Sequence, residues 1–372
     1  MVIGLVGGGT GGHFYPLIAV AEEYASQAKP PKLLYFGPNP YDKDLLEQHK
    51  IHFVRCPAGK LRRYFSPKNF LDALTTLYGI VIAIGKLYYH YPDVIFSKGG
   101  YTAIPILCAA WFLRIPVVIH ESDSTPGRAN RFASSFARYI AVSYPSTADQ
   151  FPSEKTALTG IPIRRSVLTP HPSAFAELSI PDDSTPLLYI TGGSLGSERI
   201  NNAILQLLPE LLPYVRIFHQ TGDAHEHTIK HSVHELLVHQ PELLERYYVA
   251  GSVPGPTVAS LLDAADLIIT RAGSTTLHEI ALHQKPSIVI PIPEEVSHDQ
   301  RTNAFAYARR GAAVVIEEHN LTNTLLKTEI FSILQDADRY QRMKQGTQEF
   351  AKPNAAHTIA QILLEIGYEH GS

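Results

Sequence analysis

Cysteine is nearly absent from this sequence: only Cys56 and Cys108 occur among 372 residues. Two cysteines cannot build a disulfide framework or a four-cysteine zinc site. The chain is therefore expected in a reducing compartment such as the cytosol.

Charge is also sparse and nearly balanced. Charged residues make up 18% of the chain, and 32 basic against 35 acidic side chains leave a net charge of −3. The basic field that a nucleic-acid-binding protein presents is therefore absent. A hydrophobic content of 45% excludes a disordered or low-complexity chain. At about 150 residues per domain, the length predicts two domains.

Long hydrophobic runs are missing as well. The longest uncharged apolar stretches cover 73–85 and 99–113, and both are shorter than the ~18–20 residues that span a bilayer. The sequence begins with the apolar run VIGLV and shows neither the basic region nor the cleavage site of a signal peptide. We therefore expect a soluble chain without a targeting or spanning segment, which can still touch a membrane surface.

Short apolar runs alternate with helical patterns along the whole chain. Continuous Val, Ile and Leu runs predict strands that are buried on both faces of a parallel sheet, and their alternation with helices predicts α/β, doubly wound domains. The expected strands are 2–6, 32–37, 53–58, 93–97, 116–120 and 139–143 in the first half, then 186–191, 215–220, 247–251, 266–270, 287–291 and 313–317 in the second.

A segment rich in proline and serine, 160–185, interrupts this alternation and is interpreted as an interdomain linker. We place the N-terminal domain at 1–162 and the C-terminal domain at 163–353. A last helix, about 354–370, is expected to pack back on the N-terminal domain. Both domains open with a strand, a glycine-rich turn and a helix, so a cleft between two similar domains, with ligands at the carboxyl ends of the strands, is predicted.

The first glycine-rich turn, 7–13, matches the pattern G-x-G-x-x-G between a strand and a helix. A dinucleotide site would also need an acidic residue where the second strand ends, and the sequence there reads Tyr35-Phe36-Gly37-Pro38. NAD binding is therefore disfavoured. A turn with so few side chains still allows close approach of a ligand. His13 could act there as a general base, with helix capping or packing as its alternative role.

Two turns of the second half offer binding groups of another kind. The turn 192–197 precedes a helix, and free N–H groups at a helix start suit a diphosphate, although the lysine of a Walker A loop is absent. In the loop 270–279, Ser274 is expected to cap a helix and Glu279 lies about one turn further on. A carboxylate there can hold both hydroxyls of a ribose. A purely structural turn and an exposed, solubilising glutamate are the alternatives.

Three further groups carry weaker signals. Asp299 and Gln300 offer donors and acceptors for sugar hydroxyls. In HESDSTPGRANR, which follows a strand, Glu121 or Asp123 could act as acid or base. The six histidines between His219 and His239 lack the carboxylate or cysteine partners of a metal site and are interpreted as a solvated helical region.

One window departs from the balanced charge of the whole chain. Between Gln48 and Leu71 there are six basic residues and no acidic one, followed by the apolar stretch LDALTTLYGIVIAIGKLYYHY. One interpretation is a buried helix behind a solvated loop. The other is an interfacial patch that attracts anionic lipid head groups. The basic side chains of such a patch would be Lys60, Arg62, Arg63 and Lys68.

Taken in order, seven motifs resemble the MurG family of glycosyltransferases. They are GGTGGH (8–13), KGGY (98–101), IPVVIHESDSTPGRANR (115–131), GIPIR (160–164), GGSLGS (192–197), TRAGSTTLHE (270–279) and HDQRTNA (298–304). The resemblance implies a GT-B architecture of two Rossmann-like domains. It implies transfer of N-acetylglucosamine (GlcNAc) from UDP-GlcNAc to the C4 hydroxyl of the N-acetylmuramic acid of lipid I. The product would be lipid II, made at the cytoplasmic face of the plasma membrane by a peripheral enzyme that requires no organic cofactor. The donor loops carry no metal-binding motif, and assistance by a divalent ion stays open on the sequence.

The resemblance also carries site residues over by motif. His13 matches the histidine of the acceptor-side glycine loop. The substrate-binding positions are Thr10, Gly11, Gly12, Asp123, Arg164, Ser194, Val253, Ser274, Thr275, Thr276, Leu277, Glu279, Asp299 and Gln300. The chain departs from the family at Asp123, where some members carry asparagine, and at Leu195, where glutamine is common.

The implied mechanism is an inverting single displacement in which His13, or behind it Asp123 or Glu121, deprotonates the acceptor hydroxyl. Two other classes of function remain open on the sequence. One is another UDP-sugar enzyme of the same architecture, either an epimerase or a transferase with a different acceptor. The other is a non-enzymatic nucleotide-binding module. The basic and apolar window favours the lipid-linked transferase, since an epimerase needs no membrane patch.

Overall fold

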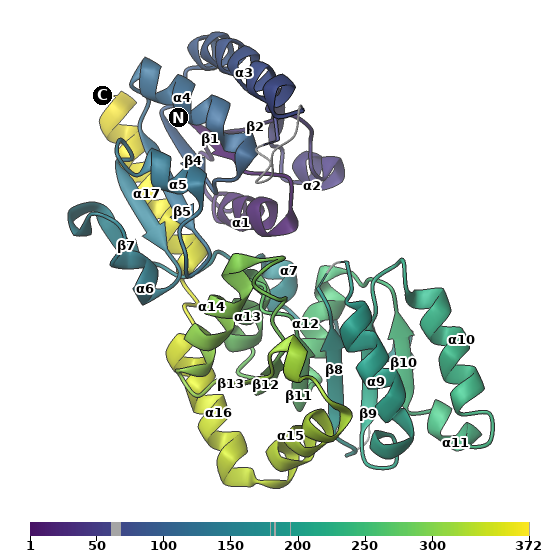
Figure 1. Cartoon of the computed structure of the whole chain (residues 1–372). Coiled ribbons are helices and arrows are strands. Elements are labelled where there is room, and N and C mark those ends of the chain that lie inside the picture. The colour runs from purple at the N-terminus through teal and green to yellow at the C-terminus, as the bar shows by residue number, and fades with distance from the viewer. Residues whose placement is uncertain (61–67, 179, 182–183, 194, 372) are drawn as a thin grey trace. The chain divides into compact units, whose positions relative to one another are not determined.

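The computed structural model describes residues 1–60, 68–178, 180–181, 184–193 and 195–371. The chain forms two compact units, one of residues 1–164 with 352–372 and the other of residues 165–351. The predicted α/β class with two parallel-sheet domains is confirmed (Figure 1).

The N-terminal unit contains a seven-stranded parallel sheet in the order β3-β2-β1-β4-β5-β6-β7. Its strands are β1 (Val2–Val6), β2 (Lys32–Gly37), β3 (His52–Arg55), β4 (Val94–Ser97), β5 (Val117–Glu121), β6 (Tyr139–Val142) and β7 (Thr156–Leu158). Its helices are α1 (Gly11–Glu22), α2 (Lys43–Gln48), α3 (Lys68–His90), α4 (Ile104–Leu113), α5 (Arg128–Ala133), α6 (Pro145–Ala148) and α17 (Ala355–Gly371), with 3-10 turns at Tyr101–Ala103 and Ser153–Lys155.

The C-terminal unit contains a six-stranded parallel sheet in the order β10-β9-β8-β11-β12-β13. Its strands are β8 (Leu187–Thr191), β9 (Arg216–Gln220), β10 (Tyr247–Ala250), β11 (Leu267–Thr270), β12 (Ser287–Val289) and β13 (Ala313–Val315). Its helices are α7 (Arg165–Leu168), α8 (Ala174–Glu177), α9 (Glu198–Leu211), α10 (Glu226–Leu236), α11 (Pro241–Leu244), α12 (Gly255–Ala264), α13 (Ser274–Leu282), α14 (His298–Ala308), α15 (Asn323–Gln335) and α16 (Ala337–Phe350), with a 3-10 turn at Glu318–Asn320.

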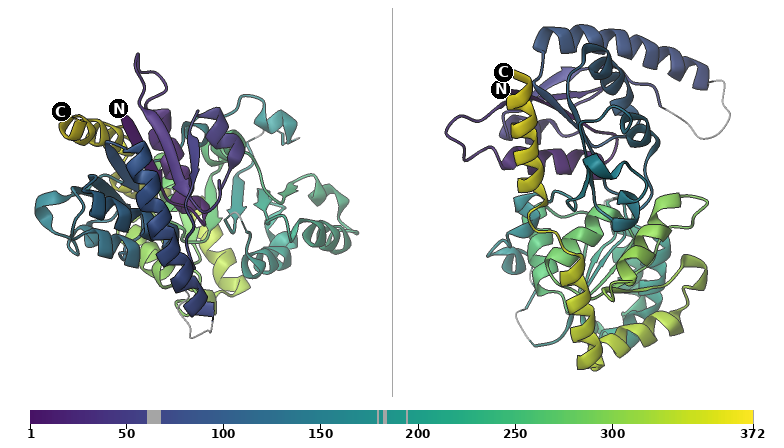
Figure 2. Two further views of the ribbon diagram at one scale, coloured as in Figure 1. Left: turned by 90° about the horizontal axis from the view of Figure 1, so that it is seen from above. Right: turned by 90° about the vertical axis from the view of Figure 1, so that its left-hand side faces the viewer.

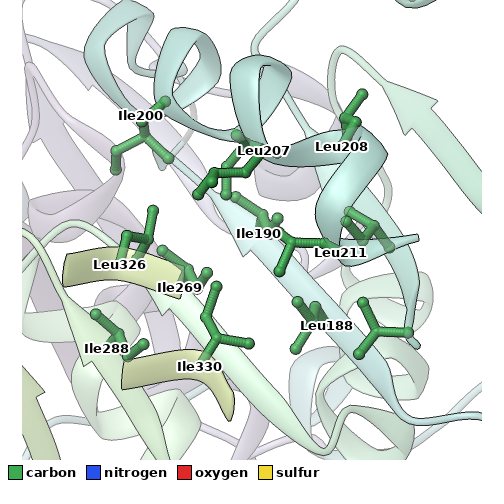
Figure 3. Close-up of a cluster of buried hydrophobic side chains, with 14 of the residues drawn as sticks. Leu188, Ile190, Ile200, Leu207, Leu208, Leu211, Ile269, Ile288, Leu326 and Ile330 are labelled. Atoms are coloured by element: carbon green, nitrogen blue, oxygen red, sulfur yellow. The ribbon is translucent and has the colours of Figure 1, made fainter. Parts of the chain in front are cut away.

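The core of the C-terminal unit explains why its strands read as unbroken apolar runs. Leu188 and Ile190 of β8 are fully buried, and they pack beneath α9 and α15 (Figure 3). In α9 the buried residues recur at helical spacing, from Ile200 through Ile204 to Leu211. Burying one such aliphatic side chain stabilises the fold by about 1.5–3 kcal/mol.

The last helix, α17, belongs to the N-terminal unit. Its residues Ile359 and Leu363 are fully buried against that unit's core, and the Tyr24 hydroxyl of α1 donates a hydrogen bond of 3.0 Å to the Ala360 carbonyl. A Cβ built on Gly367 would lie 3.1 Å from Met1, so the two ends of the chain lie side by side, as Figures 1 and 2 show.

The segment 160–185 is not a free linker. Arg165–Leu168 and Ala174–Glu177 form α7 and α8, and both pack against α12. The buried side chains of Val167 and Ala174 account for this, because they give the proline-rich stretch an apolar anchor in the C-terminal unit.

Helix α3 departs from two expectations, namely that no apolar segment is long enough to span a bilayer and that this segment forms a buried helix. Residues Phe70–His90 form one helix long and apolar enough to cross a membrane by length and composition, although the uncharged run within it is shorter. Most of this helix is exposed, including Leu77 at 60% and Val81 at 67%, while Ala83 and Leu87 are buried toward α4. The apolar face of α3 is therefore an exposed surface of the N-terminal unit.

Candidate functional site

Three loops of the N-terminal unit meet because the strands before them are neighbours. Val6, at the end of β1, pairs with Ser97 at the end of β4, and Ser97 pairs with Ile119 of β5. Because the strands are parallel, the loops that follow them all leave from the carboxyl edge of the sheet. The strand order reverses between β1 and β4, which is where open α/β sheets bind ligands.

Close packing explains the glycines of the first loop. The Tyr35 hydroxyl donates a 2.8 Å hydrogen bond to the Gly7 carbonyl, and a Cβ on Gly8 would lie 2.6 Å from the same hydroxyl. Gly9 has φ +90°, a conformation that favours glycine. A Cβ on Gly11 would lie 2.8 Å from the Tyr15 ring, and Gly12 is exposed.

His13 is held by the residue that precedes its helix. Thr10 occupies the N-cap position of α1 without a side-chain capping bond, and its hydroxyl instead pairs with His13 Nδ1 at 2.8 Å. His13 therefore does not cap the helix. A Cβ on Gly100 would lie 3.6 Å from His13 Nε2, so the ring edge faces the loop after β4. Burial first, and the Lys98 charge second, lower the pKa of His13 to about 4, so the ring is neutral at pH 7.

The two carboxylates after β5 have different surroundings. Glu121 is 5% exposed, and its carboxylate accepts hydrogen bonds from the backbone N–H groups of Asp123 (3.2 Å) and Gly127 (2.9 Å) and from Asn130 Nδ2 (2.9 Å). Burial raises the pKa of Glu121, and these hydrogen bonds oppose the rise. The Glu121 carboxylate is thus occupied by hydrogen bonds that stabilise its own loop. The Asp123 side chain, by contrast, is only partly buried. Of the two, Asp123 is better placed to meet a ligand.

A third titratable group stands behind these loops and was not singled out from the sequence. Lys98 follows β4 directly and is 2% exposed. Its ammonium contacts Ser122 Oγ and His120 Nδ1, and His120 Nε2 lies 2.7 Å from the Gly160 carbonyl oxygen. A lysine placed immediately after a fully buried strand was the signal in the sequence.

Arg164 is the last residue of the N-terminal unit. Its guanidinium carbon lies 3.7 Å from the centre of the Tyr15 ring, a cation–π contact that orients the side chain. Tyr15 is a further residue that sequence reasoning missed.

In the C-terminal unit, Thr191 at the end of β8 pairs with Thr270 at the end of β11, so the loops after these strands leave from the same edge. Ser194 lies outside the described residues. A Cβ on Gly196, whose φ is +75°, would lie 1.9 Å from the Thr221 carbonyl oxygen, so this glycine is required by packing. Ser197 caps α9 by accepting a hydrogen bond of 3.3 Å from the Ile200 N–H.

The loop after β11 departs from one expectation. The N-cap of α13 is Gly273, and Ser274 is the first helical residue, so the prediction that Ser274 caps this helix is wrong. Backbone dihedrals decide the cap, and Gly273 has the extended conformation that a cap requires. Leu277 is fully buried and its N–H is bonded to the Gly273 carbonyl at 3.0 Å, so its side chain belongs to the core.

The remaining polar residues of α13 lie closer to the surface. Thr275, Thr276 and Glu279 are partly buried. The charge of Glu279, after burial, raises the pKa of Tyr189 in β8, which places the carboxylate near this ring. The Tyr189 hydroxyl donates a 2.6 Å hydrogen bond to Gln220 Oε1 at the end of β9.

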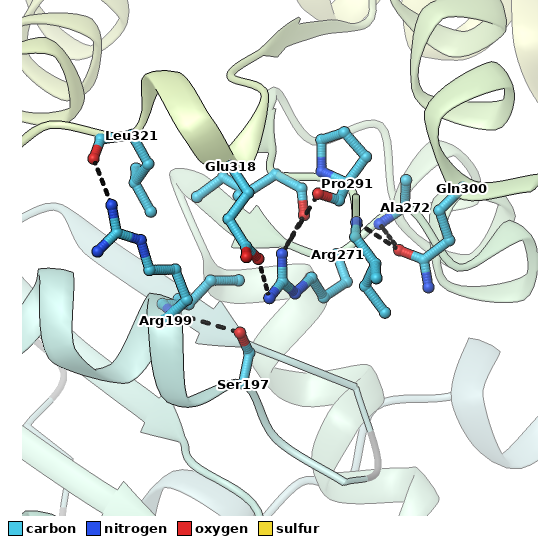
Figure 4. A network of polar contacts seen from close by, with 11 residues as sticks. Ser197, Arg199, Arg271, Ala272, Pro291, Gln300, Glu318 and Leu321 are labelled. Atoms are coloured by element: carbon cyan, nitrogen blue, oxygen red, sulfur yellow. Dashed lines mark hydrogen bonds and ion pairs between the residues drawn. The ribbon is translucent and has the colours of Figure 1, made fainter. Parts of the chain in front are cut away.

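Gln300 joins two loops rather than only offering its amide to a ligand. Its Oε1 accepts hydrogen bonds from the N–H groups of Ala272 (3.1 Å) and Ile292 (3.3 Å), as Figure 4 shows for this network. The preceding residue, Asp299, lies in the first turn of α14. Gln300 therefore ties the loop after β11 to the loop after β12.

Arg271 makes a second such tie and was also missed. One guanidinium nitrogen donates to the Ile290 carbonyl at 3.1 Å, and the other lies 2.5 Å from the Glu318 carboxylate (Figure 4). Val253, by contrast, lies on the loop between β10 and α12, and β9 separates β10 from β8. Among the described residues no group of three or more His, Cys, Asp or Glu side chains could hold a metal ion.

Known families match both units. Residues 3–142 match the glycosyltransferase family 28 N-terminal domain, and residues 187–359 match the glycosyltransferase family 28 C-terminal domain.

Curated relatives match nearly the whole chain. A protein of Bacillus cereus named UDP-N-acetylglucosamine–N-acetylmuramyl-(pentapeptide) pyrophosphoryl-undecaprenol N-acetylglucosamine transferase 2 is 34% identical over 96% of this chain and 98% of its own length. A Clostridium kluyveri protein named as the same transferase is 34% identical over 87% of this chain and 88% of its own length.

Two solved structures share the fold. The crystal structure of Acinetobacter baumannii MurG has a TM-score of 0.72 at 24% identity and covers 98% of this chain and 99% of its own. A UDP-GlcNAc 2-epimerase from Neisseria meningitidis has a TM-score of 0.70 at 15% identity, again covering 98% and 99% of the two chains.

The hydrogen bonds by which Gln300 joins the two loops predict different unfolding free energies for two substitutions. Gln300→Ala removes the acceptor of two backbone N–H groups and should lower the unfolding free energy by about 1–3 kcal/mol. Gln300→Glu keeps acceptor oxygens and should cost less than about 1 kcal/mol. Urea unfolding of the full chain measures both, with the exposed Gln341→Ala as the control. Equal stability of Gln300→Ala and the control would contradict the tie.

Proposed function

The chain belongs to the MurG family within glycosyltransferase family 28, and from this membership we propose that it transfers GlcNAc from UDP-GlcNAc to the C4 hydroxyl of the N-acetylmuramic acid in undecaprenyl-linked lipid I. The product is lipid II, a precursor of peptidoglycan. The observation that carries the proposal is the identity of 34% across 96% of the chain with a transferase of this name.

The C-terminal unit supplies the donor-binding groups in this proposal. Glu279 accepts hydrogen bonds from the ribose hydroxyls. Thr275 and Thr276, at the start of α13, hold the nucleotide through their backbone groups. The loop 192–197 and the start of α9 present N–H groups and the positive end of the helix dipole to the diphosphate. To these groups of the C-terminal unit we add Arg164, the last residue of the N-terminal unit, which Tyr15 orients and whose positive charge stabilises the leaving UDP in this proposal.

The N-terminal unit supplies the acceptor-side chemistry. In the single displacement, the C4 hydroxyl oxygen bonds to the anomeric carbon of GlcNAc, the bond from that carbon to the UDP oxygen breaks, and a base takes the hydroxyl proton. His13 is our first choice for the base: its ring is neutral at pH 7, and Nε2 has no hydrogen-bond partner among the described residues. Asp123 stands behind it. Glu121 is the weakest candidate because its loop already occupies its carboxylate.

The exposed face of α3 provides a membrane-binding surface in the same proposal. This face presents Phe70, Leu74, Leu77 and Val81. The basic residues of the window next to it are Lys60, Arg62, Arg63 and Lys68. Arg62 and Arg63 lie outside the described residues, and the side chain of Lys68 is not described. Apolar side chains enter the interface while basic ones meet anionic head groups. Because α3 also packs against α4, the helix lies on the membrane instead of crossing it. The enzyme is then peripheral, on the cytoplasmic face where UDP-GlcNAc is available.

A direct assay tests the proposed reaction. The purified full chain is incubated with UDP-GlcNAc and a lipid I analogue, and UDP release is measured together with the disaccharide product. One UDP for each disaccharide is expected. UDP release, or a change in the sugar, without the acceptor would replace the transferase with a hydrolase or an epimerase.

Glu279 should act mainly on donor affinity. Glu279→Gln removes a charged acceptor, and hydrogen bonds to charged groups contribute about 1.5–3 kcal/mol. The KM for UDP-GlcNAc should therefore rise roughly 10- to 100-fold, with kcat changed much less. Steady-state kinetics measure this, with the exposed Glu242→Gln as the matched control. An unchanged donor KM would reject the ribose role.

His13 should act mainly on turnover. Loss of a general base lowers the rate by ~10²-fold or more, so His13→Ala should reduce kcat by this factor with little change in donor KM. The exposed His239→Ala serves as the control. Near-normal turnover of His13→Ala would move the base to Asp123.

Substitutions on the exposed face of α3 should weaken membrane binding without changing the rate of the transfer reaction. The double substitution Leu77→Ser and Val81→Ser should reduce sedimentation with anionic phospholipid vesicles about tenfold, since it removes most of two exposed aliphatic side chains. Turnover on a short-chain, water-soluble acceptor should stay unchanged. Leu236→Ser with Val238→Ser, on an exposed part of the C-terminal unit, is the control. Equal vesicle binding by both double variants would contradict the surface.

A further inference from the structure

Lys98 is the most deeply buried charged side chain at the carboxyl edge of the N-terminal sheet. It is 2% exposed, and its ammonium lies against Ser122 Oγ and His120 Nδ1. Burying an ammonium costs several kcal/mol unless other groups compensate for it. A lysine in this position therefore needs a reason beyond packing.

Lys98 contacts all three loops of this edge. It begins the loop after β4, and its head group contacts His120 and Ser122 at the end of β5. A Cβ on Gly7, in the loop after β1, would lie 2.8 Å from Lys98 Cβ and 2.8 Å from the His13 carbonyl oxygen. The lysine stem thus fills the space behind the glycine loop that carries His13.

The hydrogen bonds around His120 define its tautomer. As an ammonium, Lys98 can only donate, so His120 Nδ1 accepts from it, and the ring proton is on Nε2, which donates to the Gly160 carbonyl at 2.7 Å. The charges of Glu121 and Asp123 also act on Lys98.

We propose that Lys98 is a positioning residue of the transfer reaction: its buried head group, which contacts His120 and Ser122, holds in place the loop after β5 that carries Asp123. This rests on the proposed function, because it assigns a part in that reaction. It adds a residue that touches no substrate and acts through the loop that does.

The protonation state of Lys98 should determine how well it holds the loop after β5. Burial lowers the pKa of Lys98 to about 7, although the charges of Glu121 and Asp123 oppose the decrease. The groups that face it are His120, Glu121, Asp123 and, through the glycine loop, His13. Loss of the proton above about pH 7 weakens the charge-assisted hydrogen bonds by which Lys98 holds His120 and Ser122. Turnover should therefore fall as the pH rises through about 7.

The same deprotonation should have the opposite effect on stability. The pKa of Lys98 is lower in the folded protein than its ordinary value of 10.5. Between about pH 7 and 10 this residue binds more protons in the unfolded chain than in the folded chain, so the contribution of Lys98 to stability rises with pH in this window. A purely structural lysine would not link rising stability to falling turnover.

Two variants with a matched control test the proposal. Lys98→Met keeps the stem and removes the charge, so kcat should fall at least about 30-fold, and the donor KM should change by less than about twofold. Lys98→Arg keeps the charge at every pH, so it should retain more turnover than Lys98→Met and lose the decrease above pH 7. Lys29→Met, an exposed lysine of the same unit, should behave as the wild type.

The readouts are pH profiles of kcat and of the thermal unfolding midpoint for the wild type and each variant. The proposal is overturned if Lys98→Met turns over within threefold of the wild type, or if the wild-type kcat does not fall between pH 7 and 10. Should neither Lys98 variant fold, the pH profile of the wild-type kcat alone decides. Calorimetric binding of UDP-GlcNAc, measured in parallel, separates damage to the whole chain from an effect at Lys98. If no transfer occurs with any protein, the proposed function fails, and the difference between the stability profiles of the wild type and Lys98→Met still shows whether Lys98 titrates near pH 7.

Discussion

The site residues of both units depend on one constraint of parallel sheets: strands that run together must end at the same edge. In the N-terminal unit, the pairing of β1 with β4 and of β4 with β5 brings the glycine loop, the KGGY loop and the Glu121 loop to that edge. In the C-terminal unit, β8 and β11 bring the loops 192–197 and 270–279 together in the same way. Residues more than 100 positions apart in the chain become neighbours without any direct attraction between them.

Close backbone packing explains much of the composition of these loops. The Tyr35 hydroxyl against Gly8 and the Thr221 carbonyl against Gly196 leave no room for a side chain. The glycines are thus required by the fold before any ligand is considered. Glycine also lets a ligand approach the backbone closely, so structural need and binding chemistry select the same residue.

Most of the architecture could be predicted from the sequence because continuous apolar runs report burial on both faces of a sheet. All twelve expected strands occur, whereas β7 was missed, since Thr156–Leu158 is short and its side chains are only partly buried. The hydrophobicity of the sequence could not show that α3 is largely exposed, because exposure depends on which other elements pack against the helix. The cap at Gly273 depends on backbone dihedrals, and the ties made by Gln300 and Lys98 depend on loops that only the folded chain brings together.

The two edges differ in the kind of electrostatics they use, and this difference suits the two halves of a transfer reaction. The N-terminal edge concentrates titratable groups, His13, Lys98 and Glu121, whose pKa values burial shifts. In the proposed reaction, His13 or Asp123 takes the proton from the acceptor hydroxyl. The C-terminal edge offers the starts of α9 and α13 and a glycine loop, which are fixed dipoles. Fixed dipoles can hold a diphosphate in the ground state and as it leaves, without gaining or losing protons themselves. The proposed reaction thus places proton transfer at one sheet edge and charge stabilisation at the other.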